Sequence, residues 1–376
     1  MLALCSLLAI AILVASCSST REITRPAGSY RIIAYVFGER GMDIRQIQAE
    51  KLTHINYAFA NVDSAGRIVL ERPVNAAHLA KLNSLRARNP QLKILLSVGG
   101  WGWSDYFSDA ALTDSSRTEF ARTGVDLVVA YALDGLDLDW EYPGQRGEDN
   151  IFRPEDKQNF TLMLKTLREE LDAQGARDGH RYLLTIATGA NDRYLEHTEM
   201  DKVQQYLDFV NIMTYDFYGV YSQTTGHHTN LNRSDSPHAS SVSALSGVEG
   251  HLRAGVPPEK IVVGAAFYGK GWGGVAGVDQ GRYQQYERYV GSYPYGRLVG
   301  EFIGRDGFVR YWDEGASAPY LWNADSTIFI SYDDPESLRH KAGFVKENGL
   351  GGMMYWEHNH DPGQELLGAI YDELNR

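Results

Sequence analysis

Cysteine and N-terminal charge are both scarce in this chain. Of its 376 residues only Cys5 and Cys17 are cysteines, and residues 1–16, MLALCSLLAIAILVAS, carry no charged side chain. This apolar run is too short to cross a bilayer alone and predicts a signal peptide over residues 1–16. Its removal would leave Cys17 as the last cysteine of an exported protein, so no disulfide can form within the mature chain. We therefore expect the hydrophobic core to stabilise the fold.

Cys17 ends the run VASC, which resembles the cleavage box of bacterial lipoproteins, where small residues precede a cysteine. Cleavage there would make Cys17 a lipidated N-terminus, joined to the folded part by the polar tether 17–29. Ser18, in place of aspartate, resembles lipoproteins sorted to the outer membrane of a Gram-negative host. We expect an exported cell-envelope lipoprotein whose only membrane contact is this lipid. The alternative is an ordinary signal peptide with an incidental cysteine, and a secreted protein.

A concentrated basic face is also missing. The chain has 36 lysines and arginines against 48 aspartates and glutamates, a net charge of −12 that is spread along the sequence without an acidic tail. Nucleic acid binding needs clustered positive charge, so the sequence argues against that function and favours a neutral or weakly charged ligand. Aromatic residues are plentiful, with 23 tyrosines and 7 tryptophans, and their faces suit stacking on sugar rings. We expect a monomer that binds such a ligand.

Repeats and low-complexity segments are absent, and from residue 30 onward apolar runs of strand length alternate with helical patterns. The clearest helical pattern begins at Pro154. Alternating apolar strands and helices indicate a parallel sheet, and a count of eight favours a closed (β/α)8 barrel. An open doubly wound sheet is the alternative, but no glycine fingerprint follows the first strand. The eight expected strands are 31–38, 54–62, 93–100, 133–140, 182–189, 209–217, 261–269 and 351–358.

One connection between a strand and the next helical pattern is much longer than the others. About 60 residues separate the seventh strand from the helical segment 335–349, and they are rich in tyrosine and tryptophan. A connection of this length is unlike a plain loop and predicts a small α+β lobe over residues 273–332, inserted between strand 7 and helix 7. The barrel would then comprise residues 30–272 and 333–376.

Three acids alternate along the fourth strand. Asp137, Asp139 and Glu141 are separated by the apolar residues at 136, 138 and 140, so all three acids share one face of the strand. In a barrel the apolar face meets the helices and the acids point inward, where unpaired carboxylates cost several kcal/mol each. This arrangement does not stabilise the fold, and the carboxyl end of a barrel strand is where catalytic groups lie. The alternative, an antiparallel strand with a solvated acidic face, conflicts with the apolar character of the other strands.

The arrangement also limits the chemistry. Ordinary glycosidases place two carboxylates on opposite sides of the scissile bond, which acids on a single strand cannot do. A 2-acetamido sugar supplies its own nucleophile, the acetamido oxygen. Glu141 would then protonate the leaving oxygen while Asp139 binds the acetamido N–H, and we expect Asp137 and Asp139 to titrate as a coupled pair.

The run DGLDLDWEYPG resembles the D-x-x-D-x-D-x-E signature of glycoside hydrolase family 18, the chitinase family, through Asp134, Asp137, Asp139 and Glu141. The similarity extends over residues 30–376 and includes SVGGW at 97–101. It implies hydrolysis of β-1,4 bonds between N-acetylglucosamine units of chitin or chitooligosaccharides, endo- or exo-acting, by a retaining, substrate-assisted mechanism. Glu141 would be the general acid/base, and the other catalytic residues would be Asp137, Asp139, Tyr215 and Asp216. No cofactor or metal is expected.

The resemblance also implies roles for residues on other strands. Tyr215 would bond the acetamido carbonyl, Asp216 would assist the acid, and Trp356 would lie under the sugar at the cleavage site. The remaining substrate contacts that it implies are Tyr35, Phe59, Gly100, Trp101, Trp140 and Met213. Each of the aromatic residues has core packing as its alternative, since most aromatic side chains in strands belong to the core.

Three alternative functions stay open. A D-x-D-x-E run can bind a hard cation, and His227, His228, His358 and His360 lie near strand ends, but their spacing is not H-E-x-x-H. Relatives that have lost the acid are chitin-binding lectins, whereas Glu141 is present here. Other relatives are endo-N-acetylglucosaminidases that cut different amino-sugar glycans.

Overall fold

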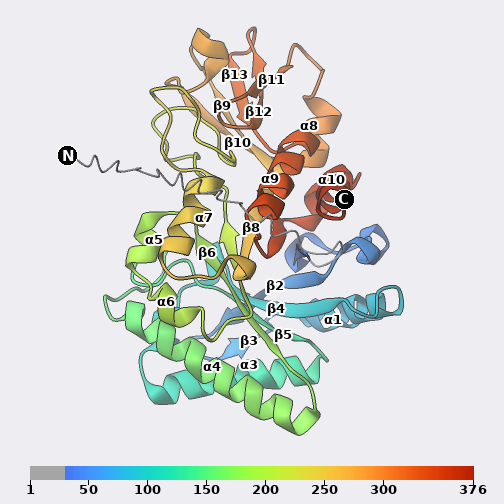
Figure 1. The fold of residues 1–376 in the computed structure, drawn as a ribbon, viewed down its shortest axis with the longest axis vertical. Helices are drawn as coiled ribbons and strands as arrows, with labels where there is room; N and C mark the ends of the chain where they lie inside the picture. The colour runs from blue at the N-terminus through green and yellow to red at the C-terminus, as the bar shows by residue number, and fades with distance from the viewer. Residues whose placement is uncertain (1–29) are drawn as a thin grey trace, which may run out of the picture.

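The computed structural model describes residues 30–376, and for Arg40 its backbone alone (Figure 1). The expected signal peptide, the tether and the lipidation site Cys17 lie outside the described residues. The barrel strands are β1 (Arg31–Phe37), β2 (His54–Val62), β4 (Lys93–Gly99), β5 (Gly135–Asp139), β6 (Leu183–Gly189), β7 (Phe209–Met213), β8 (Ile261–Ala266) and β14 (Gly352–Trp356). All eight fall within the runs expected from the sequence.

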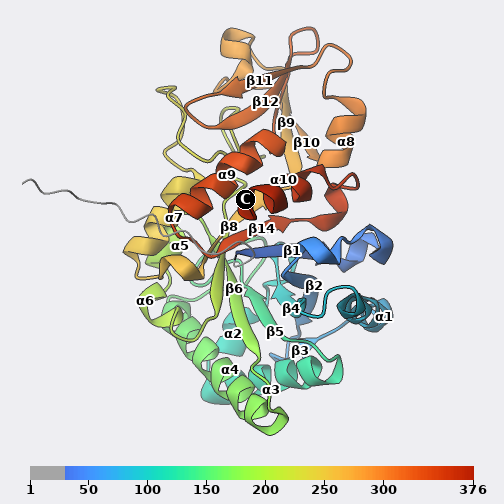
Figure 2. The same ribbon diagram turned by 45° about the vertical axis from the view of Figure 1, so that its right-hand side comes forward.

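The eight strands run parallel and form a closed barrel. They are hydrogen-bonded in the order β1-β14-β8-β7-β6-β5-β4-β2, and β1 pairs with both β14 and β2, which closes the sheet. This confirms the predicted (β/α)8 barrel and excludes the open sheet. A short strand, β3 (Ile68–Val69), adds antiparallel to the end of β2. Figures 1 and 2 show the helices surrounding the strands.

The helices bury one apolar stripe each against the outer face of the barrel. In α4 (Asp156–Asp178) the predicted stripe of Phe160, Met163, Leu164, Leu167 and Leu171 is buried. This helix begins at Asp156, two residues after the predicted start, and the Asp156 carboxylate accepts the backbone N–H groups of Arg153 at 2.7 Å and Gly144 at 3.3 Å. The other barrel helices are α1 (Pro73–Ser84), α2 (Phe107–Ala111), α3 (Asp114–Ala130), α5 (Asp192–Glu196), α6 (Met200–Val203), α7 (Ala244–Arg253), α9 (Pro335–Glu347) and α10 (Glu365–Leu374). No helix within residues 30–376 is long and apolar enough to cross a membrane.

A second, antiparallel sheet forms the lobe drawn above the barrel in Figures 1 and 2. Its strand order is β10-β9-β13-β12-β11, and α8 packs beside it. The sheet starts at Tyr268, five residues before the expected boundary at 273, because Phe267 alone separates β8 from β9. Its elements are β9 (Tyr268–Gly273), β10 (Arg288–Pro294), α8 (Tyr295–Glu301), β11 (Val309–Asp313), β12 (Ala318–Asn323) and β13 (Ile328–Ser331).

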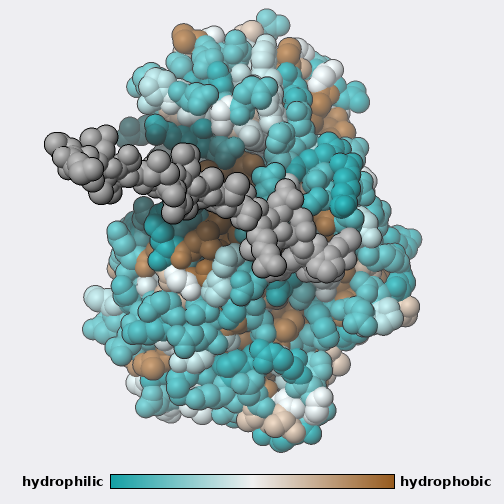
Figure 3. Space-filling model, in the orientation of Figure 1, coloured by the Kyte–Doolittle hydropathy of each residue, from teal (hydrophilic) through white to brown (hydrophobic). Residues whose placement is uncertain are grey.

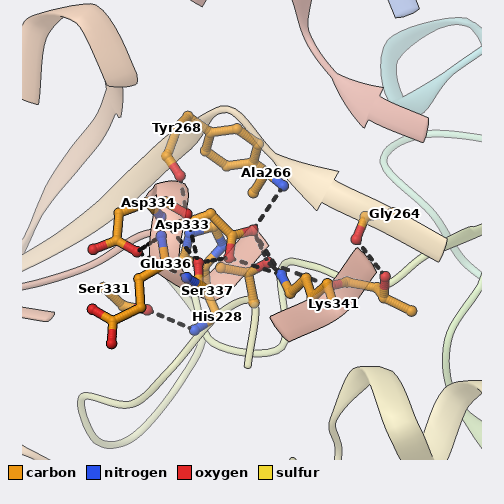
Figure 4. A network of polar contacts seen from close by, with 12 residues as sticks. His228, Gly264, Ala266, Tyr268, Ser331, Asp333, Asp334, Glu336, Ser337 and Lys341 are labelled. Atoms are coloured by element: carbon orange, nitrogen blue, oxygen red, sulfur yellow. Dashed lines mark hydrogen bonds and ion pairs between the residues drawn. The ribbon is translucent and has the colours of Figure 1, made fainter. Parts of the chain in front are cut away.

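A buried ion pair fixes the joint between the lobe and the barrel (Figure 4). The Lys341 ammonium of α9 lies 2.6 Å from the Asp333 carboxylate, which follows β13, and both side chains are fully enclosed. Lys341 also donates to the Thr229 hydroxyl at 2.7 Å, and Asp333 accepts the Ala266 backbone N–H at 3.1 Å. Because every partner is hydrogen-bonded, the cost of burying these charges is offset. The network therefore holds the end of β8, the loop after β7 and α9 together where the lobe departs.

Candidate active site

A cleft of about 740 Å³ lies at the carboxyl ends of the barrel strands, beside the lobe. The face in Figure 3 is hollowed between the lobe and the barrel, and apolar surface gathers there. The structure brings most of the expected site residues to the wall of this cleft: Tyr35, Phe59, Trp101, Asp139, Glu141, Met213, Tyr215, Asp216 and Trp356.

Asp137 lies inside the barrel, behind the cleft. Its Oδ2 accepts hydrogen bonds from the Tyr35 hydroxyl at 2.7 Å and the Ser97 hydroxyl at 2.8 Å. Its Oδ1 accepts from the Thr185 hydroxyl at 2.5 Å and the Asn211 amide at 3.1 Å. Burial raises the pKa of Asp137, and the four donors limit that rise. Asp137 is therefore a fixed, fully hydrogen-bonded group with no atom left for substrate.

Asp139 has the opposite environment. The side chain is buried, yet its Oδ1 has no hydrogen-bond partner among residues 30–376. Burial raises the pKa of Asp139 well above its ordinary value, and the charges of Glu141 and Asp137 raise it further. A buried oxygen without a partner is costly, and such a group at the wall of a cleft is suited to a ligand that supplies the missing donor.

Glu141 lies at the mouth of the same strand. Its backbone N–H donates to the Ser104 hydroxyl at 2.9 Å, which fixes the chain where β5 ends. Burial raises the pKa of the Glu141 carboxyl to about 7; the Tyr142 hydroxyl lowers it, and the charge of Asp216 raises it. A carboxylic acid that keeps its proton near neutral pH can serve as a general acid.

Tyr215 and Asp216 reach the cleft from the end of β7. The Tyr215 hydroxyl contacts the Met354 thioether at 3.9 Å, and so weak an acceptor leaves the hydroxyl available to a ligand. The Asp216 carboxylate is engaged: the Tyr268 hydroxyl donates to its Oδ1 at 2.6 Å, and the Lys270 ammonium lies 2.6 Å from the same oxygen.

The floor of the cleft is aromatic. Trp356, at the end of β14, stacks on Phe59 with ring centroids 5.6 Å apart and an interplanar angle of 23°. The centroid of its ring also lies 5.9 Å from that of Tyr35 and 5.6 Å from that of Phe37. The partners hold the Trp356 ring in one orientation, which suits a flat platform for a sugar ring.

Trp140 is a correction to the expected substrate contacts. It is 1% exposed, stacks on Phe107 at 5.4 Å and meets Phe160 edge-on at 5.5 Å. The reason is the period of two along β5, because Trp140 shares the outward face of Leu136 and Leu138 and packs under the helices. It cannot contact substrate.

Gly100 also lies outside the residues that line the cleft. Its φ is +89°, and a Cβ there would meet the Phe59 ring at 2.8 Å. A side chain at this position would displace Phe59 from the floor, so the structure assigns Gly100 a supporting contact. A direct contact with substrate stays a prediction.

The four histidines near the strand ends have separate partners. His227 contacts Asp313 at 3.1 Å, His358 bonds the Tyr355 hydroxyl at 3.0 Å, and His360 lies 3.2 Å from Glu357. His228 contacts the Tyr268 carbonyl at 3.2 Å. Within the described part of the chain, no three His, Cys, Asp or Glu side chains are grouped to hold a metal ion.

Comparison with known proteins places this arrangement in a family. The sequence profile of glycosyl hydrolases family 18 matches residues 31–361. The chain belongs to glycosyl hydrolase family 18. Chitinase A1 of Niallia circulans is 38% identical over an alignment of 432 positions that covers 98% of this chain and 62% of that protein. Chitinase B of Serratia marcescens is 30% identical, over 87% of this chain and 77% of its own length.

A solved structure of a glycoside hydrolase family 18 N-acetylglucosaminidase from Paenibacillus barengoltzii is similar throughout. It is 46% identical, with a TM-score of 0.86 over 92% of this chain and 99% of that one. The chain thus spans nearly all of this relative but less than two thirds of Chitinase A1.

The family 18 cleft contains residues that the sequence patterns missed. Tyr142, Tyr268 and Lys270 line it, the last two from β9 of the lobe. Tyr142 directly follows Glu141 and could have been found from that position. The segment FYGKGW at 267–272, which contains Lys270, resembles the family 18 subgroup with an inserted lobe beside the cleft. The contact of Lys270 with Asp216 could not be predicted, because it depends on how the lobe joins the barrel.

Proposed function

We propose that this family 18 chain hydrolyses β-1,4 bonds between N-acetylglucosamine units of chitin or chitooligosaccharides, with Glu141 as general acid/base. The observation that carries the proposal is that Glu141, whose pKa is raised to about 7, lies in the same cleft as the unpartnered Oδ1 of Asp139. The names of the relatives, chitinase and N-acetylglucosaminidase, support the same substrate class.

The nucleophile in this proposal comes from the substrate. Among residues 30–376 three carboxylates line the cleft, and Asp216 is bound by Lys270 and Tyr268. The acetamido oxygen of the bound sugar therefore attacks the anomeric carbon as Glu141 protonates the leaving oxygen, which gives an oxazolinium ion. Asp139 accepts the acetamido N–H and offsets the developing positive charge, and Tyr215 bonds the acetamido oxygen. Water, deprotonated by Glu141, then attacks the anomeric carbon and opens the oxazolinium ring, which gives a product of retained configuration.

The mechanism predicts a retained anomer and inhibition by a thiazoline analogue of the oxazolinium ion. Proton NMR of fresh chitotetraose digests should show the β-anomer first, and N-acetylglucosamine-thiazoline should compete with substrate. An unrelated thiazoline without the sugar ring serves as the inhibitor control. A first-formed α-anomer would contradict the substrate-assisted route, because inversion requires water to attack directly.

The two kinds of relative differ in the product that their names imply. The 46% identity to an N-acetylglucosaminidase that this chain covers almost completely favours release of single sugars as a second candidate. Reducing-end-labelled chitohexaose distinguishes the two. Monomer as the sole early product supports the N-acetylglucosaminidase activity, whereas dimers and trimers support chitinase action.

Activity should also fall on the basic side of neutrality. Since the Glu141 carboxyl has a pKa of about 7, the acid form is lost above that pH, and kcat/KM should decline about tenfold per pH unit beyond it. We expect the midpoint of the basic limb near pH 7 when kcat/KM for chitotriose is measured from pH 4 to 10. A profile that stays flat to pH 9 would contradict Glu141 as the acid.

A further inference from the structure

Lys270 brings a positive charge from the lobe into the cleft of the barrel. It lies on β9, the first strand of the lobe, and its Nζ is 2.6 Å from Asp216 Oδ1, just past the end of β7. The Lys270 side chain is 13% exposed, whereas Asp216 keeps 51% of its side-chain surface open towards the cleft. Exposed ion pairs contribute little, but this lysine is shielded and lines the reaction cleft.

Several groups face Asp216 besides Lys270. From β9 the Tyr268 hydroxyl donates to the same oxygen, and from the loop after β7 His228 Nδ1 lies 3.6 Å away, too far for a hydrogen bond. The remaining titratable groups around it are Glu141 and Tyr142 after β5, Tyr215 beside it, and Tyr289 on β10. Lys270 is thus the cation in bonding contact with Asp216 among residues 30–376.

The position of Lys270 is fixed by the joint of the lobe. Asp333 holds the Ala266 backbone N–H, two residues before β9 starts, and the Lys341 ammonium holds Asp333 (Figure 4). His228 and the Tyr268 carbonyl meet at 3.2 Å in the same region. The start of β9 therefore has little freedom relative to the end of β7, and the ion pair links two rigid parts of the molecule.

We propose that Lys270 is a positioning residue of the reaction: it holds the Asp216 carboxylate in the cleft and cancels the charge that Asp216 would otherwise impose on Glu141. The effect of Lys270 on catalysis rests on the proposed hydrolysis, whereas the contact between Lys270 and Asp216 does not depend on it. Lys270 acts through Asp216, so it sets the pH range in which Glu141 carries its proton.

The directions of the titrations agree with this role. Burial raises the pKa of Asp216, but His228 and the Lys270 charge more than offset that rise, so the pKa lies below its ordinary value. The Asp216 anion in turn contributes to the raised pKa of Glu141. Without Lys270 the Asp216 carboxylate keeps its contacts with Tyr268 and His228 but loses the neighbouring ammonium, so Glu141 binds its proton more tightly. Because Asp216 is half-open to solvent, we expect a modest upward shift of about 0.5–1 pH unit.

The test follows the Glu141 carboxyl directly, by ¹³C NMR titration of the full chain without substrate, its signal assigned with E141Q. We expect the titration midpoint to rise by about 0.5–1 pH unit in K270M and to stay within about 0.2 unit of wild type in K270R. R288M is the matched control, because it removes one cation from the adjacent strand β10, where Arg288 is exposed. Equal midpoints in K270M and wild type, or an equal rise in R288M, would overturn the proposal.

A double-mutant cycle asks whether Lys270 acts through Asp216. In a D216N background Lys270 has lost its partner. K270M should then shift the Glu141 midpoint by less than half of the shift that it causes when Asp216 is present. The same shift in both backgrounds would show a direct effect and contradict the positioning role. Melting curves of all variants check that they fold. If K270M does not fold, titration of K270R still tests the proposal.

Kinetics separate this inference from the proposed function. If the chain cleaves chitooligosaccharides, the basic limb of kcat/KM should move upward in K270M together with the NMR midpoint. If wild type cleaves no such substrate, the proposed function fails, but the titration still decides whether Lys270 controls Glu141. A basic limb that stays in place while the NMR midpoint moves would overturn the catalytic part of the role.

Discussion

Replacement of Glu141 by glutamine is expected to lower kcat for chitooligosaccharide hydrolysis by about 10³-fold while binding is retained. Glutamine has nearly the same shape, so the cleft and the Ser104 contact with the backbone of residue 141 should persist. It cannot give a proton to the leaving oxygen or take one from water, and both steps of the proposed mechanism need that exchange. The measurement is single-turnover hydrolysis of chitotetraose by E141Q, with chitotetraose affinity determined by calorimetry.

E148Q is the matched control for this substitution. Glu148 lies on the same loop after β5, is exposed, and is absent from the wall of the cleft. We expect its kcat to stay within about twofold of wild type, as is usual for a surface change. Turnover by E141Q near the wild-type rate would remove Glu141 from its role. If wild type itself binds chitotetraose but does not cleave it, the lectin alternative is supported.

The barrel could be predicted from the sequence because each strand is apolar and of similar length, and each is followed by a helical pattern. The orientation of the acids along β5 could also be predicted from a sequence pattern. A period of two put Asp137, Asp139 and Glu141 on one face. In the structure Asp137 bonds side chains of other strands inside the barrel, and Asp139 and Glu141 line the cleft. The rule that put the acids inside also puts Trp140 outside, under Phe107, so the substrate contact assigned to Trp140 contradicted the geometry of its own strand.

The separate environments of Asp137 and Asp139 could not be predicted. Both acids lie on β5 and both were expected to titrate together. Four donors from four other strands, β1, β4, β6 and β7, surround Asp137, whereas Asp139 Oδ1 receives none within the described chain. Such contacts depend on how strands distant in sequence come together around the barrel. The same holds for Lys270, whose approach to Asp216 depends on the joint between the lobe and the barrel.

This contrast leads to a second large effect, in which D139N loses activity and gains stability. The unpartnered Oδ1 of Asp139 is the group proposed to accept the acetamido N–H and to stabilise the positive charge of the oxazolinium ion. An amide has no charge to offset it, so kcat should fall by about 10²–10³-fold, the usual effect of removing one such electrostatic contact. The measurement is kcat for chitotetraose over the pH range in which Glu141 is protonated.

The gain in stability should depend on pH. The pKa of Asp139 is higher in the folded chain than in the unfolded chain, because burial and the neighbouring acids disfavour the anion. Asp139 therefore costs no stability below its unfolded pKa of about 3.9, and costs progressively more as the pH rises towards its folded pKa. Asparagine removes that cost, so the Tm of D139N should equal the wild-type Tm near pH 3.5 and exceed it by about 2 °C or more at pH 8.

D137N is the matched control, two residues earlier on the same strand face. The Asp137 oxygens accept four hydrogen bonds, and an amide nitrogen in place of one oxygen leaves the Asn211 amide or a hydroxyl poorly paired. A buried donor without its acceptor costs about 1–3 kcal/mol, so the Tm of D137N should fall at pH 8. Calorimetry of both variants at pH 3.5 and pH 8 gives the comparison. A lower Tm for D139N than for wild type at pH 8 would mean that Asp139 is satisfied within the protein, and the unpartnered oxygen could then no longer be assigned to the acetamido group.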